Sequence, residues 1–316
     1  MRSRALVVAL LLLLPLLLPL LLLRWVQPAP APVWLRRHPG VVPLYVENGV
    51  YLCTLRFEGA EADCVVDTGS AHLLLAGRSC RSCDDPTSLR VNKAPTETLA
   101  YGSQSSRVAW RVGALRVGRR RIAGVRAALT RDMEGETQYN ILGLARGALQ
   151  RALAPRRFAV AMLGDRGLLA LGERDVRALR RRHYAGRVAR VPLLRSARPM
   201  YGVAGALRAG ARSAAVFRGT VLVDTGSNFL SCPPRVLDAL RPSLAAHEPI
   251  ALELRTAAGE ALTLTFGADV YRHASGALLF EDDEPDVVVL GSFFMRRLAL
   301  EFDDEHLGVA RLGAAD

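Results

Sequence analysis

The sequence predicts a mainly β protein built from two related lobes that face each other across a central cleft. The tetrapeptide Asp-Thr-Gly-Ser occurs twice, at Asp67–Ser70 and at Asp224–Ser227. A Leu-Gly pair follows each copy, at Leu142-Gly143 and Leu290-Gly291. The chain has 316 residues, which is more than one ordinary hydrophobic core holds. A repeat on this scale indicates duplicated lobes and not a short-period solenoid.

Each tetrapeptide follows an apolar pair and precedes another apolar run, as Val65-Val66 and Leu73–Leu75 do around the first copy. An apolar strand that ends in Asp, followed by a glycine turn with two hydroxyls, presents a carboxylate on a rigid loop. Two facing lobes would bring Asp67 and Asp224 together, and two close carboxylates share a proton because both cannot easily ionise. One can then act as general base toward a water and the other as general acid. The residues expected to shape the two loops are Thr68, Gly69, Ser70, Thr225, Gly226 and Ser227, with the serine hydroxyls bonding the outer carboxylate oxygens.

The remaining elements follow from local patterns. Short β-branched runs between Gly, Pro and Asp breaks predict strands, and prolines ahead of apolar spacing predict a helix. A basic, polar stretch separates two strands near the middle of the chain, and we place the lobe boundary there, between residues 42–175 and 176–316. In chain order, the expected elements are a partly helical segment over 139–153, strands at 168–172, 188–193 and 219–223, a helix over 233–240 and a strand at 286–290.

These motifs resemble those of the pepsin-like aspartic proteases (peptidase family A1), from about Val42 to about Leu312. The resemblance implies the bilobal pepsin-like acid protease fold, with two pseudo-twofold-related β lobes. It also implies an aspartic endopeptidase that acts on peptide or protein substrates without metal or cofactor, and we expect a monomer. The segments that carry it besides the two tetrapeptides are Val42–Tyr45, Gly49–Tyr51, Tyr101–Ser103, Ile141–Ala145, Leu290–Arg296, Phe302-Asp303 and Gly308–Ala310.

Tyr101, Gly102 and Ser103 resemble the flap of these enzymes, a hairpin expected here between about Thr96 and Arg111 that closes over bound peptide. Many members of the family carry a Trp shortly after the first motif, and its indole bonds the flap Tyr. Leu74 stands at that place, so we expect a looser flap and weaker catalysis. The departure keeps open an alternative, a catalytically weak or silent pepsin-like peptide-binding protein, which the two intact Asp motifs disfavour.

Two of the five cysteines form the pair Cys80-x-x-Cys83. Its spacing fits half of a zinc site, with Cys53 and Cys64 as an irregularly spaced second half, or a disulfide. Pepsin-like enzymes often carry a small cystine loop where Cys80 and Cys83 fall, and an exported protein favours disulfides. We therefore expect a Cys80–Cys83 bridge.

A second disulfide candidate comes from hairpin geometry. A two-residue turn at 58–59 would place Cys53 directly opposite Cys64 with both side chains on one face. The pair falls at a hydrogen-bonded position of the hairpin, which is the less comfortable one for a disulfide. Cys232 is left over, and we expect it to be a buried free thiol.

The N-terminus predicts export. Arg2 and Arg4 precede the apolar run 5–23, which is just long enough to span a bilayer. The one candidate cleavage site, Ala29–Ala31, is followed by an unfavourable proline, so we favour an uncleaved signal anchor over a cleaved signal peptide for residues 1–24. Residues 25–41 then form a Pro-rich stalk or short pro-segment. In both cases the body lies in the secretory pathway on the lumenal or extracellular side, or is secreted after cleavage.

The net charge is +12, and every basic residue except Lys93 is arginine. Either an anionic partner or a compositional bias would explain this charge. The arginines are spread along the chain apart from one dense cluster over 177–190, and this favours the bias. No nucleic-acid-binding motif accompanies them, so we expect no specific nucleic-acid partner. His72 lies close to the first motif, where it could tune the carboxylates, but a polar loop residue is the favoured interpretation. The acidic runs 281–284 and 303–305 lack the ligand spacing of a calcium site and are expected to be solvated turns.

Overall fold

The structure is a computed structural model that describes residues 33–313, except 84, 92–94, 96, 102–103, 135–138, 196–198, 211–212, 274, 283 and 285. The chain forms two compact units, Met1–Arg37 and His38–Asp316. In the first unit the described residues form one short helix, α2 (Val33–Arg37). The apolar run 5–23 lies outside the described residues, and within them no helix is long and apolar enough to cross a membrane.

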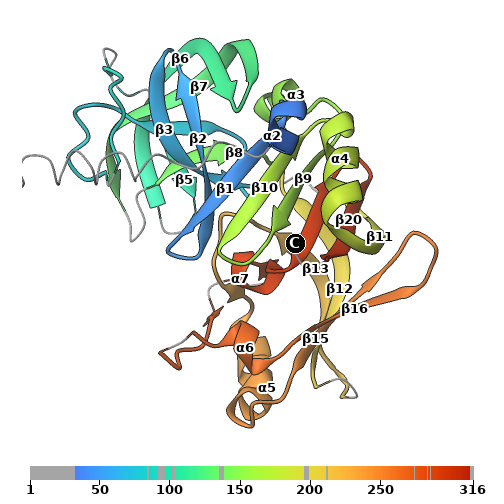
Figure 1. The fold of residues 1–316 in the computed structure, drawn as a ribbon. Coiled ribbons are helices and arrows are strands. Elements are labelled where there is room, and N and C mark those ends of the chain that lie inside the picture. Colours follow the sequence, from blue (N-terminus) through green and yellow to red (C-terminus); the bar gives the residue numbers. More distant parts are fainter. Residues whose placement is uncertain are drawn as a thin grey trace, which may run out of the picture. The chain divides into compact units, whose positions relative to one another are not determined.

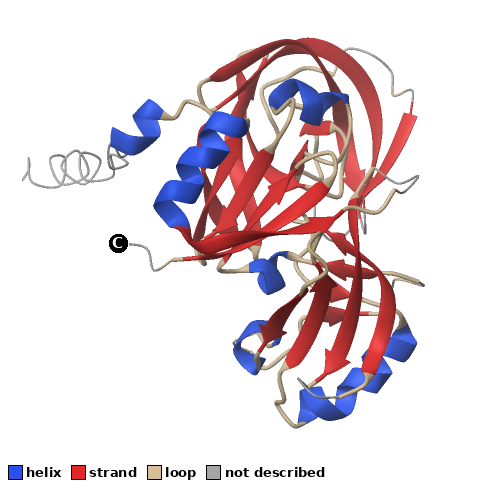
Figure 2. Cartoon of the chain, turned by 90° about the vertical axis from the view of Figure 1, so that its right-hand side faces the viewer, coloured by secondary structure: helices blue, strands red, loops and turns tan. Residues whose placement is uncertain are grey.

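The second unit is mainly β, as the sequence predicts, and consists of two large sheets (Figures 1 and 2). The larger sheet has the strand order β11-β20-β19-β9-β10-β1-β2-β3-β8-β4-β7-β6-β5. Its strands are β1 (Val41–Glu47), β2 (Val50–Phe57), β3 (Ala60–Asp67), β4 (Leu73–Ala76), β5 (Glu97–Tyr101), β6 (Gln104–Val117), β7 (Arg120–Glu134), β8 (Asn140–Gly143), β9 (Phe158–Met162), β10 (Arg166–Leu171), β11 (Tyr184–Pro192), β19 (Leu298–Phe302) and β20 (His306–Leu312).

The smaller sheet has the order β16-β15-β12-β13-β18-β14-β17. Its strands are β12 (Tyr201–Ala209), β13 (Ala215–Val223), β14 (Leu230–Ser231), β15 (Ile250–Arg255), β16 (Ala261–Phe266), β17 (Phe280–Glu281) and β18 (Val288–Leu290). The helices of this unit are α3 (Ala148–Leu153), α4 (Glu173–His183), α5 (Pro234–Ala245), α6 (Ala268–Tyr271) and α7 (Ser292–Met295). The expected helix over 233–240 is α5, which begins after Pro233 as predicted and continues past Pro242 to Ala245.

The duplication read from the sequence appears as the same strand pairing in both sheets. β3 ends at Asp67 and runs parallel to β8, with Val66 opposite Leu142. β13 ends one residue before Asp224 and runs parallel to β18, with Val223 opposite Leu290. Each Asp therefore leaves the end of an interior strand whose parallel partner carries the leucine of the Leu-Gly pair.

The two halves of the chain are also joined by continuous pairing. In the larger sheet, β9 from the first half lies between β10 and β19, and β19 and β20 come from the end of the chain (Figure 1). Phe158 on β9 stacks on Phe302 on β19 with ring centroids 4.7 Å apart, and Tyr201 packs against both rings. The lobe boundary expected between residues 175 and 176 falls inside α4 and stays a prediction.

Buried charge accompanies this joint. Glu301 is 3% exposed, and the guanidinium of Arg180 donates two hydrogen bonds to its carboxylate. Arg157 lies 4.0 Å from Glu301 and donates a 3.0 Å hydrogen bond to Asp303. Asp303 Oδ1 also accepts the backbone amides of Glu305 at 2.9 Å and His306 at 2.6 Å. A buried carboxylate is tolerated only when it is paired in this way.

We expect Asp303→Asn to lower the free energy of unfolding by about 2 kcal/mol at pH 7, the loss typical of hydrogen bonds to a charged group. Burial raises the pKa of Asp303, but the two amides and Arg157 outweigh it and bring that pKa below its ordinary value. The folded state then binds fewer protons than the unfolded chain, so the stabilisation is complete above the unfolded pKa of about 3.9 and is lost as pH falls through the folded pKa. Urea unfolding of both proteins from pH 7 to pH 3 should show the difference shrinking below about pH 4; a constant difference would contradict this assignment.

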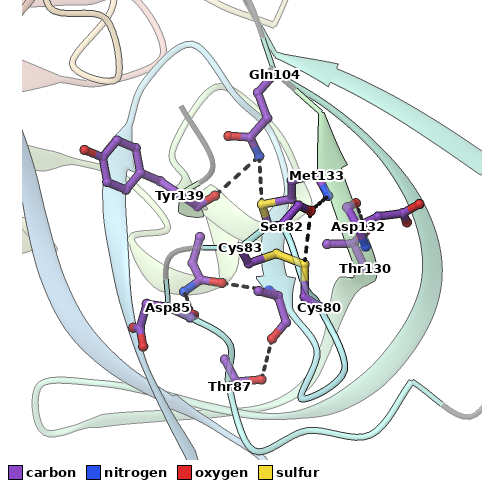
Figure 3. Close-up of a disulfide and its surroundings, with 12 residues drawn as sticks. Cys80, Ser82, Cys83, Asp85, Thr87, Gln104, Thr130, Asp132, Met133 and Tyr139 are labelled. Carbon is purple, nitrogen blue, oxygen red and sulfur yellow. Dashed lines mark hydrogen bonds between the residues drawn. A yellow bond between two sulfur atoms is a disulfide. The ribbon is translucent and has the colours of Figure 1, made fainter. Parts of the chain in front are cut away.

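The predicted Cys80–Cys83 disulfide is present and closes a small loop between β4 and β5 (Figure 3). Ser82, inside that loop, accepts the amide of Met133 at 2.9 Å. Because both sulfurs are bonded to each other, this pair is not half of a zinc site. Within the described residues, no group of three or more His, Cys, Asp or Glu is arranged to hold a metal ion.

The candidate bridge between Cys53 and Cys64 is wrong. The two residues lie directly opposite each other on β2 and β3, in the register counted from the 58–59 turn, but both are free buried thiols. Their place at a hydrogen-bonded pair, where opposite Cα atoms stand farther apart, explains why the register alone does not make a bridge. Burial, with the charge of Asp63, raises the pKa of Cys53 to about 12 and the pKa of Cys64 well above its usual value. Cys232 is buried, as predicted, and lies in the hydrophobic core.

Candidate active site

Of the two carboxyl groups of the site, Asp67 accepts more hydrogen bonds than Asp224. It is 7% exposed, and its Oδ1 accepts the backbone amides of Gly69 at 2.6 Å and Ser70 at 3.1 Å. The Ser70 hydroxyl donates to Oδ2, which is the serine contact that the tetrapeptide predicts. Three donors converge on this group and hold it in one orientation.

Asp224 is held differently, although its tetrapeptide is identical. Its Oδ1 accepts the amide of Gly226 at 2.8 Å. The expected hydrogen bond from the Ser227 hydroxyl is not made, so in the described part of the chain only one of the two serines behaves as predicted. Asn228 follows Ser227. Its Nδ2 donates to the backbone carbonyl of Asn48 at 2.7 Å, and its Oδ1 accepts the Ser292 hydroxyl at 3.3 Å. The second loop is thereby engaged with the β1–β2 turn and α7.

The two carboxyl groups lie side by side. A Cβ atom on Gly69 would come within 2.5 Å of Asp224 Oδ2, and one on Gly226 within 2.5 Å of Asp67 Cγ. Glycine is therefore required at both positions, because each loop backbone touches the opposite carboxyl group. Burial, followed by the negative charge of Asp67 and a hydrogen bond with it, raises the pKa of Asp224 well above its ordinary value. Two carboxyl groups this close share a proton, because both cannot easily ionise.

Two threonines lock the loops together. The Thr68 amide donates to Thr225 Oγ1 at 3.1 Å, and the Thr225 amide donates to Thr68 Oγ1 at 3.0 Å. Each hydroxyl then donates across the interface, Thr68 to the carbonyl of Val223 at 2.8 Å and Thr225 to the carbonyl of Val66 at 2.5 Å. Both threonines are fully buried. These four reciprocal hydrogen bonds fix the distance between the two Asp-bearing strand ends.

The Leu-Gly pairs support the loops from behind. The Leu144 amide donates to the Asp67 carbonyl at 2.6 Å, and the Asp224 amide donates to the Leu290 carbonyl at 3.1 Å. A Cβ atom on Gly143 would lie 2.5 Å from the His72 backbone, and one on Gly291 would lie 2.1 Å from the Phe229 carbonyl oxygen. Both glycines are thus needed for close approach of strand and loop.

The hairpin expected between about Thr96 and Arg111 is formed by β5 and β6. Tyr101 pairs with Gln104, so two residues connect the strands. Those residues, Gly102 and Ser103, and the side chain of Tyr101 lie outside the described part of the structure, and their role in substrate binding stays a prediction. Gln104 is buried, and its amide nitrogen lies 3.4 Å from both the carbonyl of Tyr139 and the sulfur of Met133 (Figure 3).

Sequence reasoning missed a cluster beside this hairpin. Trp110 on β6 donates its indole N–H to Glu97 on β5, with 2.6 Å between the nitrogen and Oε2. The ring of His72 meets the indole edge to face, with centroids 5.2 Å apart. The guanidinium carbon of Arg126 on β7 lies 3.8 Å from the centroid of the indole. No spacing in the sequence links these four residues, because the strand order alone brings them together.

Comparison with known proteins supports the fold. No family model matches the chain, and no curated protein matches its sequence. Among solved structures it is similar to an aspartic proteinase from Irpex lacteus, with a TM-score of 0.67 and 16% sequence identity, over 87% of this chain and 97% of that chain. The protein therefore has a pepsin-like fold, and at this identity the likeness concerns the fold alone.

Proposed function

We propose that the protein is an aspartic endopeptidase that hydrolyses internal peptide bonds with a water held between Asp67 and Asp224. The observation that carries the proposal is the unequal carboxyl pair, in which Asp67 accepts three hydrogen bonds and Asp224 lies buried beside it with a raised pKa. The similarity of the fold to an aspartic proteinase supports the same class of reaction.

In this mechanism the Asp67 carboxylate takes a proton from the water, whose oxygen bonds to the carbonyl carbon of the substrate. Asp224 donates its proton to the carbonyl oxygen, so that a neutral gem-diol forms. The C–N bond then breaks as the proton on Asp67 passes to the leaving nitrogen and a diol proton returns to Asp224. Both carboxyl groups end in their starting states, and no covalent intermediate forms with the protein.

One observation favours the alternative of a catalytically weak or silent peptide-binding protein. The Ser227 hydroxyl does not hold Asp224, so this carboxyl group has fewer fixed contacts than its partner. A less firmly oriented acid would lower the rate while leaving peptide binding intact. The two candidates therefore differ in turnover and not in the site that they use.

Incubation with a mixed peptide library across pH tests the proposal directly. We expect internal cleavage that a statine-type inhibitor blocks and a metal chelator leaves unchanged. Since the reaction needs the proton on Asp224, cleavage should disappear as pH rises through the raised pKa of that group. Saturable peptide binding without cleavage at any pH would instead establish the silent binding protein.

We also propose that the leader anchors the catalytic body on the lumenal or extracellular side of a membrane of the secretory pathway, with peptides or proteins as substrates. Arg2, Arg4 and the apolar run 5–23 support this orientation. Protease protection of a C-terminal tag in microsomes tests it. A tag cleaved from the cytosolic side would reverse the orientation, and a mature N-terminus near residue 32 would replace the anchor by a signal peptide.

A further inference from the structure

Trp110 lies in the same row of side chains as Leu74, although one strand, β7, separates their strands in the sheet order. Leu74 on β4 pairs with Ala128 on β7, and Ala128 pairs with Trp110 on β6. All three belong to one small apolar cluster that also contains Leu99 of β5. Because alanine has no atoms beyond Cβ, the middle of the row leaves room for the indole. Trp110 thus brings an indole to the neighbourhood of Leu74, where the sequence alone indicated none.

The indole touches three elements other than its own strand. Its N–H donates to Glu97 at the start of β5, its face meets His72 in the loop after Asp67, and Arg126 of β7 covers it. The bond to Glu97 has a charged acceptor, and such bonds are shorter and stronger than neutral ones. The cationic guanidinium is attracted to the ring. One half-buried side chain therefore connects both strands of the hairpin to the loop that carries Asp67.

The charges around the cluster agree with this arrangement. Burial lowers the pKa of His72, Glu97 opposes that effect, and Arg126 adds to it. The imidazole next to the indole is therefore neutral near pH 7, and the anion of Glu97 and the cation of Arg126 flank Trp110.

His72 connects the Trp110 cluster to the loop that carries Asp67. His72 lies five residues after Asp67, and its carbonyl accepts the Gly143 amide at 3.0 Å. At the other end of the hairpin, Gln104 lies against the Tyr139 carbonyl. The hairpin is thus held near its base by the Trp110 cluster and near its tip by Gln104.

We propose that Trp110, fixed by Glu97 and His72, is a positioning residue that holds the β5–β6 hairpin in register with the Asp67 loop. Its effect on catalysis rests on the proposed endopeptidase function. The hairpin must arrive over the scissile bond in one orientation, since small misplacements of a bound peptide cost large factors in rate. Under this proposal the hairpin is held more firmly than Leu74 alone predicts, because the indole comes from β6 and not from the strand after the first motif.

Two substitutions test the proposal, each in the full-length protein. Trp110→Phe keeps an aromatic face for His72 and Arg126 but removes the N–H donor, and Glu97→Gln removes the charge of the acceptor. Glu61→Gln is the matched control, since Glu61 also accepts a cross-strand hydrogen bond, from Arg56, at an exposed site outside the cluster. Peptide cleavage gives kcat and KM, and backbone hydrogen exchange followed by mass spectrometry reports the opening of segment 97–110.

We expect Trp110→Phe and Glu97→Gln to speed exchange in segment 97–110 and to lower kcat/KM about tenfold or more, while Glu61→Gln changes neither. Unchanged exchange in both variants would overturn the proposal whatever the activity. Faster exchange with unchanged kcat/KM would overturn the positioning role. If the wild-type protein cleaves no peptide, the proposed function fails, and the exchange arm still decides whether Trp110 holds the hairpin. If Trp110→Phe does not fold, Glu97→Gln decides, because it keeps the indole.

Discussion

Asp224→Asn is expected to abolish measurable peptide cleavage, with kcat reduced by roughly 10³-fold or more, the range of a general acid–base group. Asparagine has nearly the shape of aspartic acid, so its side-chain oxygen can still accept the Gly226 amide. It has no proton to give to the carbonyl oxygen and cannot take one back from the diol. The reaction would stop at the first proton transfer although the loop remains in place.

The same substitution should not destabilise the protein at pH 7. A carboxyl group whose pKa is raised in the folded state, as that of Asp224 is, opposes folding once pH exceeds its unfolded value. Asparagine removes that cost, so the Tm of Asp224→Asn should equal or exceed that of the wild type. Asp238→Asn is the matched control, because Asp238 lies on α5 in an exposed pair with Arg241, and it should keep full activity. Undiminished cleavage by Asp224→Asn would reject the carboxyl pair as the catalytic centre.

Much of the site follows from the sequence, because its geometry is local. An apolar strand, an Asp and a glycine turn define each loop within a few residues. The Leu-Gly pairs can also be recognised in the sequence, because one follows each tetrapeptide. The register of Cys53 against Cys64 could likewise be counted from a two-residue turn. In each case the residues that determine the geometry are neighbours in the chain or in one hairpin.

Other properties of the site depend on the strand order, which the sequence does not show. Leu74 in place of a Trp indicated that the hairpin lacks an indole, but Trp110 supplies one. Its position near Leu74 follows from the strand order β4-β7-β6, in which Ala128 pairs with both residues. His72, interpreted from the sequence as a polar loop residue, contacts that indole for the same reason.

The difference between the two identical tetrapeptides also lies beyond local pattern. The Ser70 hydroxyl donates a hydrogen bond to Asp67, whereas the Ser227 hydroxyl makes none to Asp224. The residues that follow the two serines also differ. The Asn228 side chain contacts the β1–β2 turn and Ser292. The position of the second loop therefore depends on partners from distant parts of the chain. A duplicated motif therefore predicts where two groups meet, whereas the different hydrogen bonding of Asp67 and Asp224 comes from their surroundings.

Thr225→Val should lower the free energy of unfolding by about 2–4 kcal/mol, because buried groups left without hydrogen-bond partners cost about 1–3 kcal/mol each. Valine has the shape of threonine but no hydroxyl. The change leaves the Val66 carbonyl without the donor that now lies 2.5 Å away and the Thr68 amide without its acceptor. Both groups are inside the joint between the loops, where the surrounding threonines are fully buried.

Urea unfolding of three variants measures this effect. Thr54→Val is the control, since Thr54 makes its one hydroxyl bond to Asp63 at an exposed site, and a surface change of this kind should stay within about 0.5 kcal/mol. Thr225→Ser keeps the hydroxyl and should recover most of the stability lost in Thr225→Val. The activity of Thr225→Val should also fall, because the loops that set the separation of Asp67 and Asp224 are no longer locked to each other. If Thr225→Val unfolds like the Thr54→Val control, the threonine hydroxyls do not fix the loops, and other contacts, such as the pairing of β9 with β19 and the bond from Asn228 to Asn48, must hold the two carboxyl groups in register.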